Sequence, residues 1–428
     1  MKRIVTYLLV FLLLLPISFS FLSNSIRGLY IAPSDLIIFA LLALPWIIQT
    51  RTISSGSRRI ITISIYAFII FCLIGAAGAL INSDTITNVL SAVNFSKFFL
   101  MIPVGYVCTA YLGAKRLFSA ITIAIVLFPI VLVVSDALFN RGWPKPRWGE
   151  YVFGFQVHGH PNLSTLFLVF LFTGLLSYYL HKKDKQLIVL IPLVLFAMFP
   201  SLSLSRNAVL SQILAIGLCV ILTRRTNIRA IAIIVGSCCA LVFFVIVYME
   251  PIANSLVFRY ETTLRQIDTF SHRKELWLVA IELFQEKPVF GHMFVSFSTH
   301  SWAGSTHQQY LEVLYKTGLI GFIVYFNVIA QLLKVLLGLN RRHRSPSTSW
   351  LIVWMITAWF TIMFSNLFQP NFTYSITSNA FLFMIGMLLA YDDGHTYSIA
   401  RMLPKTSNLM TFSSSPENVS AKIDYHPC

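Results

Sequence analysis

The chain is dominated by long stretches of apolar residues that are separated by short polar segments. Many of these stretches are about 17–22 residues long, enough to cross roughly 30 Å of hydrocarbon at about 1.5 Å per helical residue. The pattern predicts an all-α polytopic membrane protein with about twelve transmembrane helices. The expected spans are 4–22, 32–49, 60–81, 92–112, 117–138, 161–180, 186–200, 207–223, 229–249, 309–337, 350–368 and 374–391.

One stretch breaks this alternation, because residues 250–308 have little membrane character. A loop of this length in a compact helix bundle is usually functional or forms a small subdomain. Within it, residues 272–286 alternate apolar and charged positions with helical spacing, which predicts an amphipathic helix that ends before Pro288 and Gly291. The expected organisation is helices 1–9 over 1–249, a large loop over 250–308, helices 10–12 over 309–391 and a polar tail over 392–428.

Composition agrees with this architecture: 57% of the 428 residues are hydrophobic and 11% are charged, far below the value of about 25% for soluble domains. The six cysteines lie in apolar runs or at the last residue, outside any CxxC pair, so neither a disulfide framework nor a zinc site is predicted. No other group of residues has metal-ligand spacing, and no cofactor-binding motif is found.

The net charge of +16 suggests nucleic-acid binding until it is sorted by side of the membrane. If the N-terminus is cytoplasmic, the cytoplasmic side carries 20 of the 32 basic residues and a charge of +15, and the opposite side carries +1. This excess follows the positive-inside rule, so no nucleic-acid partner is expected. The even number of helices places both termini in the cytoplasm and residues 250–308 outside it.

Several cationic side chains are predicted at the outer face. Arg206 opens the eighth span, where free backbone N–H groups and the positive helix end favour an anion; the alternative is an interfacial arginine that reaches lipid headgroups. His160 opens the sixth span in the same way; the alternative is that it is part of a helix cap. His307 precedes the tenth span, and it could serve as a proton acceptor or as a structural residue.

The large loop adds Arg265, Arg273 and His300, any of which could instead lie on a solvated face. Arg273 is expected in the first turn of the amphipathic helix, beside its positive end. Taken together, two arginines and a histidine at one outer interface would form a cationic pocket for a lipid phosphate or diphosphate. A histidine beside that pocket could act as a general base.

Three short motifs carry a family resemblance. Residues 271–321 contain an R-x-x-x-W helix from Arg273, a P-x-x-G turn from Pro288, and a segment H-x-x-Y-L-E-x-x-x-x-x-G-x-x-G from His307. In their order and spacing they resemble the O-antigen ligase and O-antigen polymerase superfamily, and the resemblance extends over about residues 155–325.

The resemblance implies a metal-independent, inverting glycosyltransferase with a GT-C-like fold in the bacterial inner membrane, without a cofactor. Its donor would be an undecaprenyl-diphosphate-linked glycan, its acceptor a sugar hydroxyl of lipid A–core, and its active site would face the periplasm among membrane lipids. By motif match, Arg206 and Arg273 would hold the diphosphate and His307 would be the catalytic base. Arg265, His160 and His300 are possible secondary contacts.

Two alternatives remain open. The polymerases use ten residues between an arginine and a glycine, as between Arg206 and Gly217, but the matching position after Arg273 is Phe284, so the ligase is favoured. A transporter of lipid-linked sugars would usually show paired halves and charges near the middle of the bilayer, and neither is visible in the sequence.

Overall fold

The structure is a computed structural model that describes residues 2–14, 19–20, 30–31, 35, 37–38, 53–82, 85–139, 151–152, 155–156, 161–181, 186–202, 206–223, 268–303, 305–343, 346–370 and 376–402. Almost all of these residues are helical. The longer helices are α1 (Lys2–Leu14), α3 (Ser55–Ile81), α4 (Thr85–Ser96), α5 (Met101–Leu112), α6 (Ala114–Phe139), α7 (Pro161–His181), α8 (Gln186–Leu202), α9 (Arg206–Thr223), α12 (Asp268–Glu286), α13 (Gln309–Arg342), α14 (Pro346–Ser365) and α16 (Ile376–Met402).

Short elements complete the described part. Two 3₁₀ turns, η2 (Lys97–Leu100) and η3 (Phe297–Thr299), lie between longer helices. Strand β1 (Phe19–Ser20) pairs antiparallel with β2 (Tyr30–Ile31), and β3 (Tyr151–Val152) pairs with β4 (Phe155–Gln156). Each strand has two residues, so the fold is a helix bundle.

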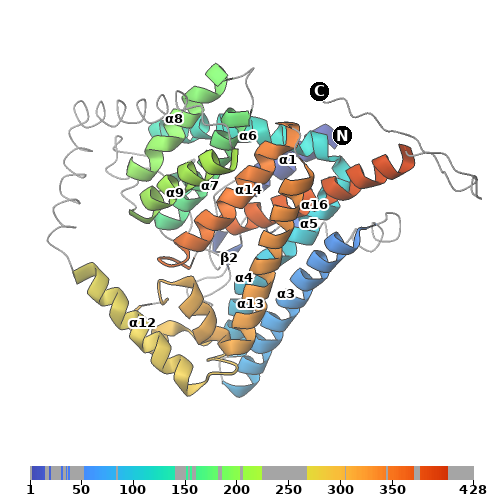
Figure 1. The fold of residues 1–428 in the computed structure, drawn as a ribbon. Helices are drawn as coiled ribbons and strands as arrows, with labels where there is room; N and C mark the ends of the chain where they lie inside the picture. Colours follow the sequence, from blue (N-terminus) through green and yellow to red (C-terminus); the bar gives the residue numbers. More distant parts are fainter. Residues whose placement is uncertain are drawn as a thin grey trace, which may run out of the picture.

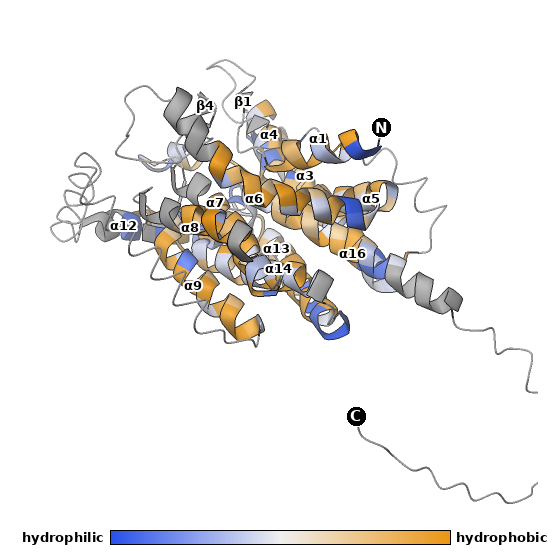
Figure 2. Cartoon of the chain, turned by 90° about the horizontal axis from the view of Figure 1, so that it is seen from above, coloured by the Kyte–Doolittle hydropathy of each residue, from blue (hydrophilic) through white to orange (hydrophobic). Residues whose placement is uncertain are grey.

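Five helical stretches in the described part are long and apolar enough to span a membrane: Ser55–Ile81, Ile86–Leu112, Ala114–Val131, Gln309–Arg342 and Thr348–Ser365. Two shorter apolar helices cover Leu166–His181 and Asn207–Thr223. A helical membrane protein is therefore supported, while the number of twelve spans stays a prediction. The expected span 229–249 and most of 32–49 lie outside the described residues. Figure 2 shows hydrophobic colour along much of α6, α8 and α9 and hydrophilic colour where α1 begins.

Close helix packing at the centre depends on small residues. A Cβ atom on Gly105 of α5 would collide with the backbone of Phe383, and one on Gly386 of α16 would collide with the carbonyl of Ile102. The two glycines therefore let α5 and α16 approach at backbone distance, as is common for helices that pack within membranes.

Helix α12 is the predicted amphipathic helix, although it begins four residues earlier, at Asp268. Its apolar face is buried through Leu276, Ala280 and Leu283, whereas Lys274 and Glu282 are exposed, as the spacing predicts. Figure 1 shows α12 at the end of the bundle opposite to the beginning of α1, close to the beginning of α13.

The last helix is longer than expected. Helix α16 continues to Met402, past the predicted start of the tail at 392, and residues 403–428 lie outside the described part. Asp393 accepts hydrogen bonds from the hydroxyls of Tyr106 (2.8 Å) and Ser57 (3.0 Å), and Asp392 pairs with Arg342 at 2.7 Å. Partners from three other helices explain why two adjacent acids remain inside the bundle rather than opening a solvated tail.

Candidate functional site

A tight turn precedes α13 and contains His307. The hydroxyl of Thr306 donates to the carbonyl of Gln308 at 2.8 Å, and the side chain of Gln308 caps α13 by accepting from the amide of Leu311 at 3.3 Å. Between these two residues, His307 has φ 53°, in the left-handed region. A residue other than glycine is strained in this backbone conformation, and strained residues of this kind cluster at functional sites.

Glu312, one turn into α13, holds this turn in place. Its fully buried carboxylate accepts hydrogen bonds from the backbone amide of Thr306 (3.0 Å) and from the Thr306 hydroxyl (3.1 Å). The same carboxylate forms a buried ion pair with Lys316 at 2.7 Å. Thr306, the residue before His307, is therefore held at its amide and its hydroxyl by the carboxylate of Glu312. Lys316 neutralises the charge of that carboxylate.

His307 is half-buried, and its Nδ1 atom is buried without a hydrogen-bond partner among the described residues. Burial lowers the pKa of its imidazole, and the positive charge of Arg273 lowers it further. A hydrogen bond with the side chain of Gln369 and the negative charge of Glu312 act in the opposite direction. The net effect is a lowered pKa, which favours the neutral form of the ring, the form that can accept a proton.

Arg273 acts on this histidine from a different part of the chain, because its charge lowers the pKa of His307. It is the sixth residue of α12, so it lies in the second turn and not in the first turn as expected. The helix dipole acts mainly within the first turn, so the site gains the charge of Arg273 rather than the positive end of α12. An apolar cluster attaches α12 to α13 and its preceding loop, with Leu276, Ala280, Phe297 and Tyr315 among its members.

A backbone clasp, formed by residues 288–294, fixes the turn after α12 to α13. Helix α13 is broken at Gly318, where φ is 60° and ψ is −161°. The break frees amides and carbonyls that the clasp then binds. The amides of Leu319 and Ile320 donate to Pro288 and Val289 (2.9 and 3.3 Å), and the carbonyls of Tyr315 and Lys316 accept from His292 and Phe294 (2.8 and 3.2 Å).

Glycine is required on both sides of this clasp. A Cβ atom on Gly318 would collide with the carbonyl of Val289, and one on Gly291 (φ 61°) would lie 2.5–2.7 Å from the backbone of Tyr315, Thr317 and Gly318. The P-x-x-G turn and the first glycine after His307 are thus one structural unit. It ties the helix that carries Arg273 to the helix that follows His307.

The beginning of α9 also meets this region. The side-chain amide of Asn207 donates to the hydroxyl of Ser365 at 2.7 Å, at the end of α14. The next residue, Asn366, accepts from the backbone amide of Gln309 at 2.9 Å, two residues after His307. The backbone of Arg206 is therefore close to the turn, while its side chain is outside the described part.

The structure gives less information about the other predicted site residues. His300 is exposed, and its ring lies edge-on to His292 with centroids 5.2 Å apart. His160 and Arg265 lie outside the described residues. Within the described part of the chain, no group of three or more His, Cys, Asp or Glu residues could hold a metal ion. The positive charge that the structure describes at His307 comes from Arg273.

Sequence reasoning did not single out Glu312 or Gln369 as parts of the site. Glu312 stands within the H-x-x-Y-L-E motif, and an acid inside an otherwise apolar helix is a signal that could have identified it. Gln369 belongs to no motif. It becomes part of the site because the turn that follows α14 brings it to His307.

A family model matches the part of the chain that contains these residues. Residues 191–326 match the family model described as O-antigen ligase, an interval that includes Arg206, Arg273, His307 and both glycines of the clasp. The resemblance based on short motifs is thereby confirmed for the O-antigen ligase and polymerase superfamily. A search of curated proteins found no match to the chain.

Proposed function

Because the chain contains a segment of the O-antigen ligase family, we propose that it is a glycosyltransferase that attaches O-antigen to lipid A–core. The donor is a glycan on undecaprenyl diphosphate, and the reaction takes place on the periplasmic face of the bacterial inner membrane. The observation that supports this most is the environment of His307: its buried Nδ1 atom has no hydrogen-bond partner among the described residues, and burial and the charge of Arg273 lower its pKa.

In the proposed reaction, Arg273 and Arg206 bind the diphosphate of the donor. An acceptor hydroxyl attacks the anomeric carbon from the side opposite to the diphosphate, and His307 takes the hydroxyl proton. The bond between the anomeric carbon and the diphosphate oxygen breaks, which leaves undecaprenyl diphosphate and an inverted glycoside. The arginines stabilise the negative charge that develops on the leaving diphosphate, and His307 then loses its proton to water.

Electrostatics favour this assignment of roles. Without donor, burial and the charge of Arg273 keep His307 unprotonated and able to act as a base. A bound diphosphate adds negative charge near the ring and offsets the effect of Arg273, so the imidazolium that forms during the reaction is stabilised. The donor therefore strengthens the base that its own transfer needs.

The best test is transfer between purified lipids in detergent with His307→Ala as the variant. Loss of a general base lowers the rate by about 10²–10⁴-fold, so kcat should fall by at least about 100-fold. His300→Ala is the matched control, since His300 is exposed and ring-packed, and it should stay within about threefold of the parent. Normal transfer by a folded His307→Ala protein would refute the proposed role of the base.

The second candidate is a polymerase that uses the same donor and transfers it to another lipid-linked repeat. The spacing between Arg206 and Gly217 favours it. Product analysis distinguishes the two, because the ligase yields glycan on the lipid core and the polymerase yields longer glycan on the carrier lipid. Turnover of either kind without an ion gradient would exclude a transporter.

A further inference from the structure

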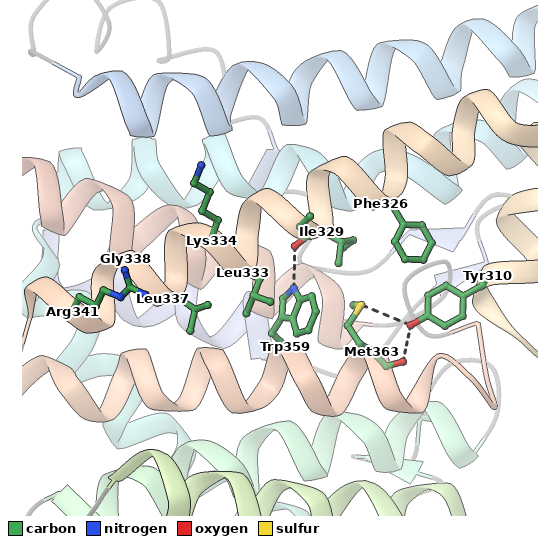
Figure 3. Close-up of a pocket in the computed structure, with 11 residues that line it drawn as sticks. Tyr310, Phe326, Ile329, Leu333, Lys334, Leu337, Gly338, Arg341, Trp359 and Met363 are labelled. Carbon is green, nitrogen blue, oxygen red and sulfur yellow. Dashed lines mark hydrogen bonds between the residues drawn. The ribbon is translucent and has the colours of Figure 1, made fainter.

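A groove runs between α13 and α14, from Tyr310, three residues after His307, toward Arg341 at the end of α13. It has a volume of about 610 Å³. Figure 3 shows Tyr310, Phe326 and Met363 toward one end of the groove and Lys334, Gly338 and Arg341 toward the other.

The wall of the groove is held by hydrogen bonds between the two helices. The Tyr310 hydroxyl donates to the carbonyl of Met363 at 2.8 Å, and the indole N–H of Trp359 donates to the carbonyl of Ile329 at 3.1 Å. Both aromatic rings are therefore fixed where they line the groove (Figure 3). The groove is preformed and does not need a ligand to shape it.

Charge is confined to one end. Lys334 and Arg341 lie seven residues apart, two turns along α13, and both line the groove and are exposed. Within the described residues neither has an ion-pair partner, whereas the adjacent Arg342 is paired with Asp392 at 2.7 Å. Two uncompensated cations at the mouth of an apolar groove are complementary to a ligand with an anionic head and an apolar tail.

Space and length also fit a lipid. Gly338 lies between the two cations along the helix, and a Cβ atom there would meet nothing within 4 Å. From Lys334 to Phe326 is eight residues, or about 12 Å of helix. This is close to the thickness of one leaflet of hydrocarbon, about 15 Å, so an acyl chain that starts at the cations would end near Phe326 and Trp359.

We propose that this groove is a binding site for an anionic phospholipid, with its phosphate on Lys334 and Arg341 and an acyl chain along Trp359 and Phe326. By the charge distribution of the chain, this end of α13 faces the cytoplasm, so the lipid belongs to the inner leaflet. The site is distinct from the proposed donor site, because Lys334 and Arg341 lie near the end of α13 (Gln309–Arg342), whereas His307 precedes the beginning of that helix. The inference does not depend on the proposed transferase activity.

Native mass spectrometry of the full chain tests this, after incubation with phosphatidylglycerol or phosphatidylethanolamine. A basic residue beside the phosphate of a bound lipid favours anionic lipid by about fivefold, so Lys334→Ala together with Arg341→Ala should weaken phosphatidylglycerol binding about thirtyfold. The matched control is Arg58→Ala with Arg59→Ala, which removes two exposed cations near the beginning of α3, outside the groove. The control should bind phosphatidylglycerol as the parent does.

A second variant tests the groove without changing its charge. Gly338→Leu fills the space between the cations and should reduce phosphatidylglycerol binding at least tenfold while the protein remains folded. Equal loss in the Arg58 and Arg59 control, equal affinity for both lipids, or a polyprenyl phosphate as the lipid that copurifies in the groove would overturn the proposal. Unchanged binding in Gly338→Leu would overturn it as well.

Discussion

Glu312 binds both the backbone amide and the hydroxyl of Thr306, at 3.0 and 3.1 Å, and so fixes the residue that directly precedes His307. A fully buried carboxylate is costly unless it is paired, and Lys316 supplies the pair at 2.7 Å. The left-handed conformation of His307 follows from this arrangement, because the polypeptide must turn sharply between Thr306 and the cap of α13.

Glu312→Gln should therefore destabilise the protein and impair the site. Removal of one partner from a buried ion pair leaves Lys316 uncompensated, at a cost of about 3 kcal/mol. The negative charge of Glu312 raises the pKa of His307, so its loss should lower that pKa and move the acid limb of kcat/KM to lower pH. Thermal unfolding in detergent and a pH profile measure the two effects.

Glu282→Gln is the matched control for this variant, because Glu282 is exposed on α12 and should leave both stability and pH profile unchanged. Glu312→Gln combined with Lys316→Met removes the uncompensated charge and should recover part of the stability. If the double variant also recovers full kcat, the carboxylate of Glu312 is not needed to hold the turn.

Arg273→Gln should shift the pH dependence in the opposite direction. The arginine lowers the pKa of His307, so its removal should raise that pKa, and the acid limb of kcat/KM should move to higher pH. Protonation of the base would then cost activity at pH values where the parent enzyme is still fully active. The KM for the donor should rise as well, since the proposed contact between Arg273 and the diphosphate would be lost.

Lys274→Gln provides the comparison for Arg273→Gln. It removes the same charge from the next residue of α12, where the side chain is exposed. Its pH profile should match that of the parent enzyme. An equal shift in both variants would mean that the overall charge of α12, rather than Arg273, determines the pKa of His307.

Gly318→Ala should open the backbone clasp. Alanine at φ 60° is strained, and its Cβ atom would collide with the carbonyl of Val289, so we expect a loss of about 1–3 kcal/mol in thermal unfolding. Gly217→Ala is the control, because Gly217 is helical and a Cβ atom there would meet nothing within 4 Å. That substitution should be neutral or slightly stabilising. Equal stability of the two variants would show that the clasp contributes nothing.

Much of the architecture can be predicted from hydropathy. Apolar runs locate helices such as α3 and α13, because burial in hydrocarbon leaves a helix as the only way to pair backbone groups over such a length. The face of α12 is also predictable, because its apolar positions recur with helical spacing. The break at Gly318 cannot be predicted from hydropathy, because it depends on carbonyl acceptors of residues 288–289, which are distant in sequence.

The candidate site also contains residues that the sequence identifies and residues that it does not. Arg273 and His307 can be identified because both stand in motifs with fixed spacing. Gln369 cannot, since only the packing of α14 brings it to the histidine. Asp392 and Asp393 look like the start of a solvated tail, and they remain in α16 because Arg342, Tyr106 and Ser57 from other helices pair with them.

The clasp also limits how the site can admit its substrates. Four main-chain bonds join the segment that follows α12 to the broken turn of α13, so the arginine and the histidine travel as one body. Widening the space between them would require those bonds to open together. By contrast, the bond described between α9 and α14 near the site is a side-chain hydrogen bond from Asn207 to Ser365, so we expect the α9 side to be the easier route for the glycan of the proposed donor.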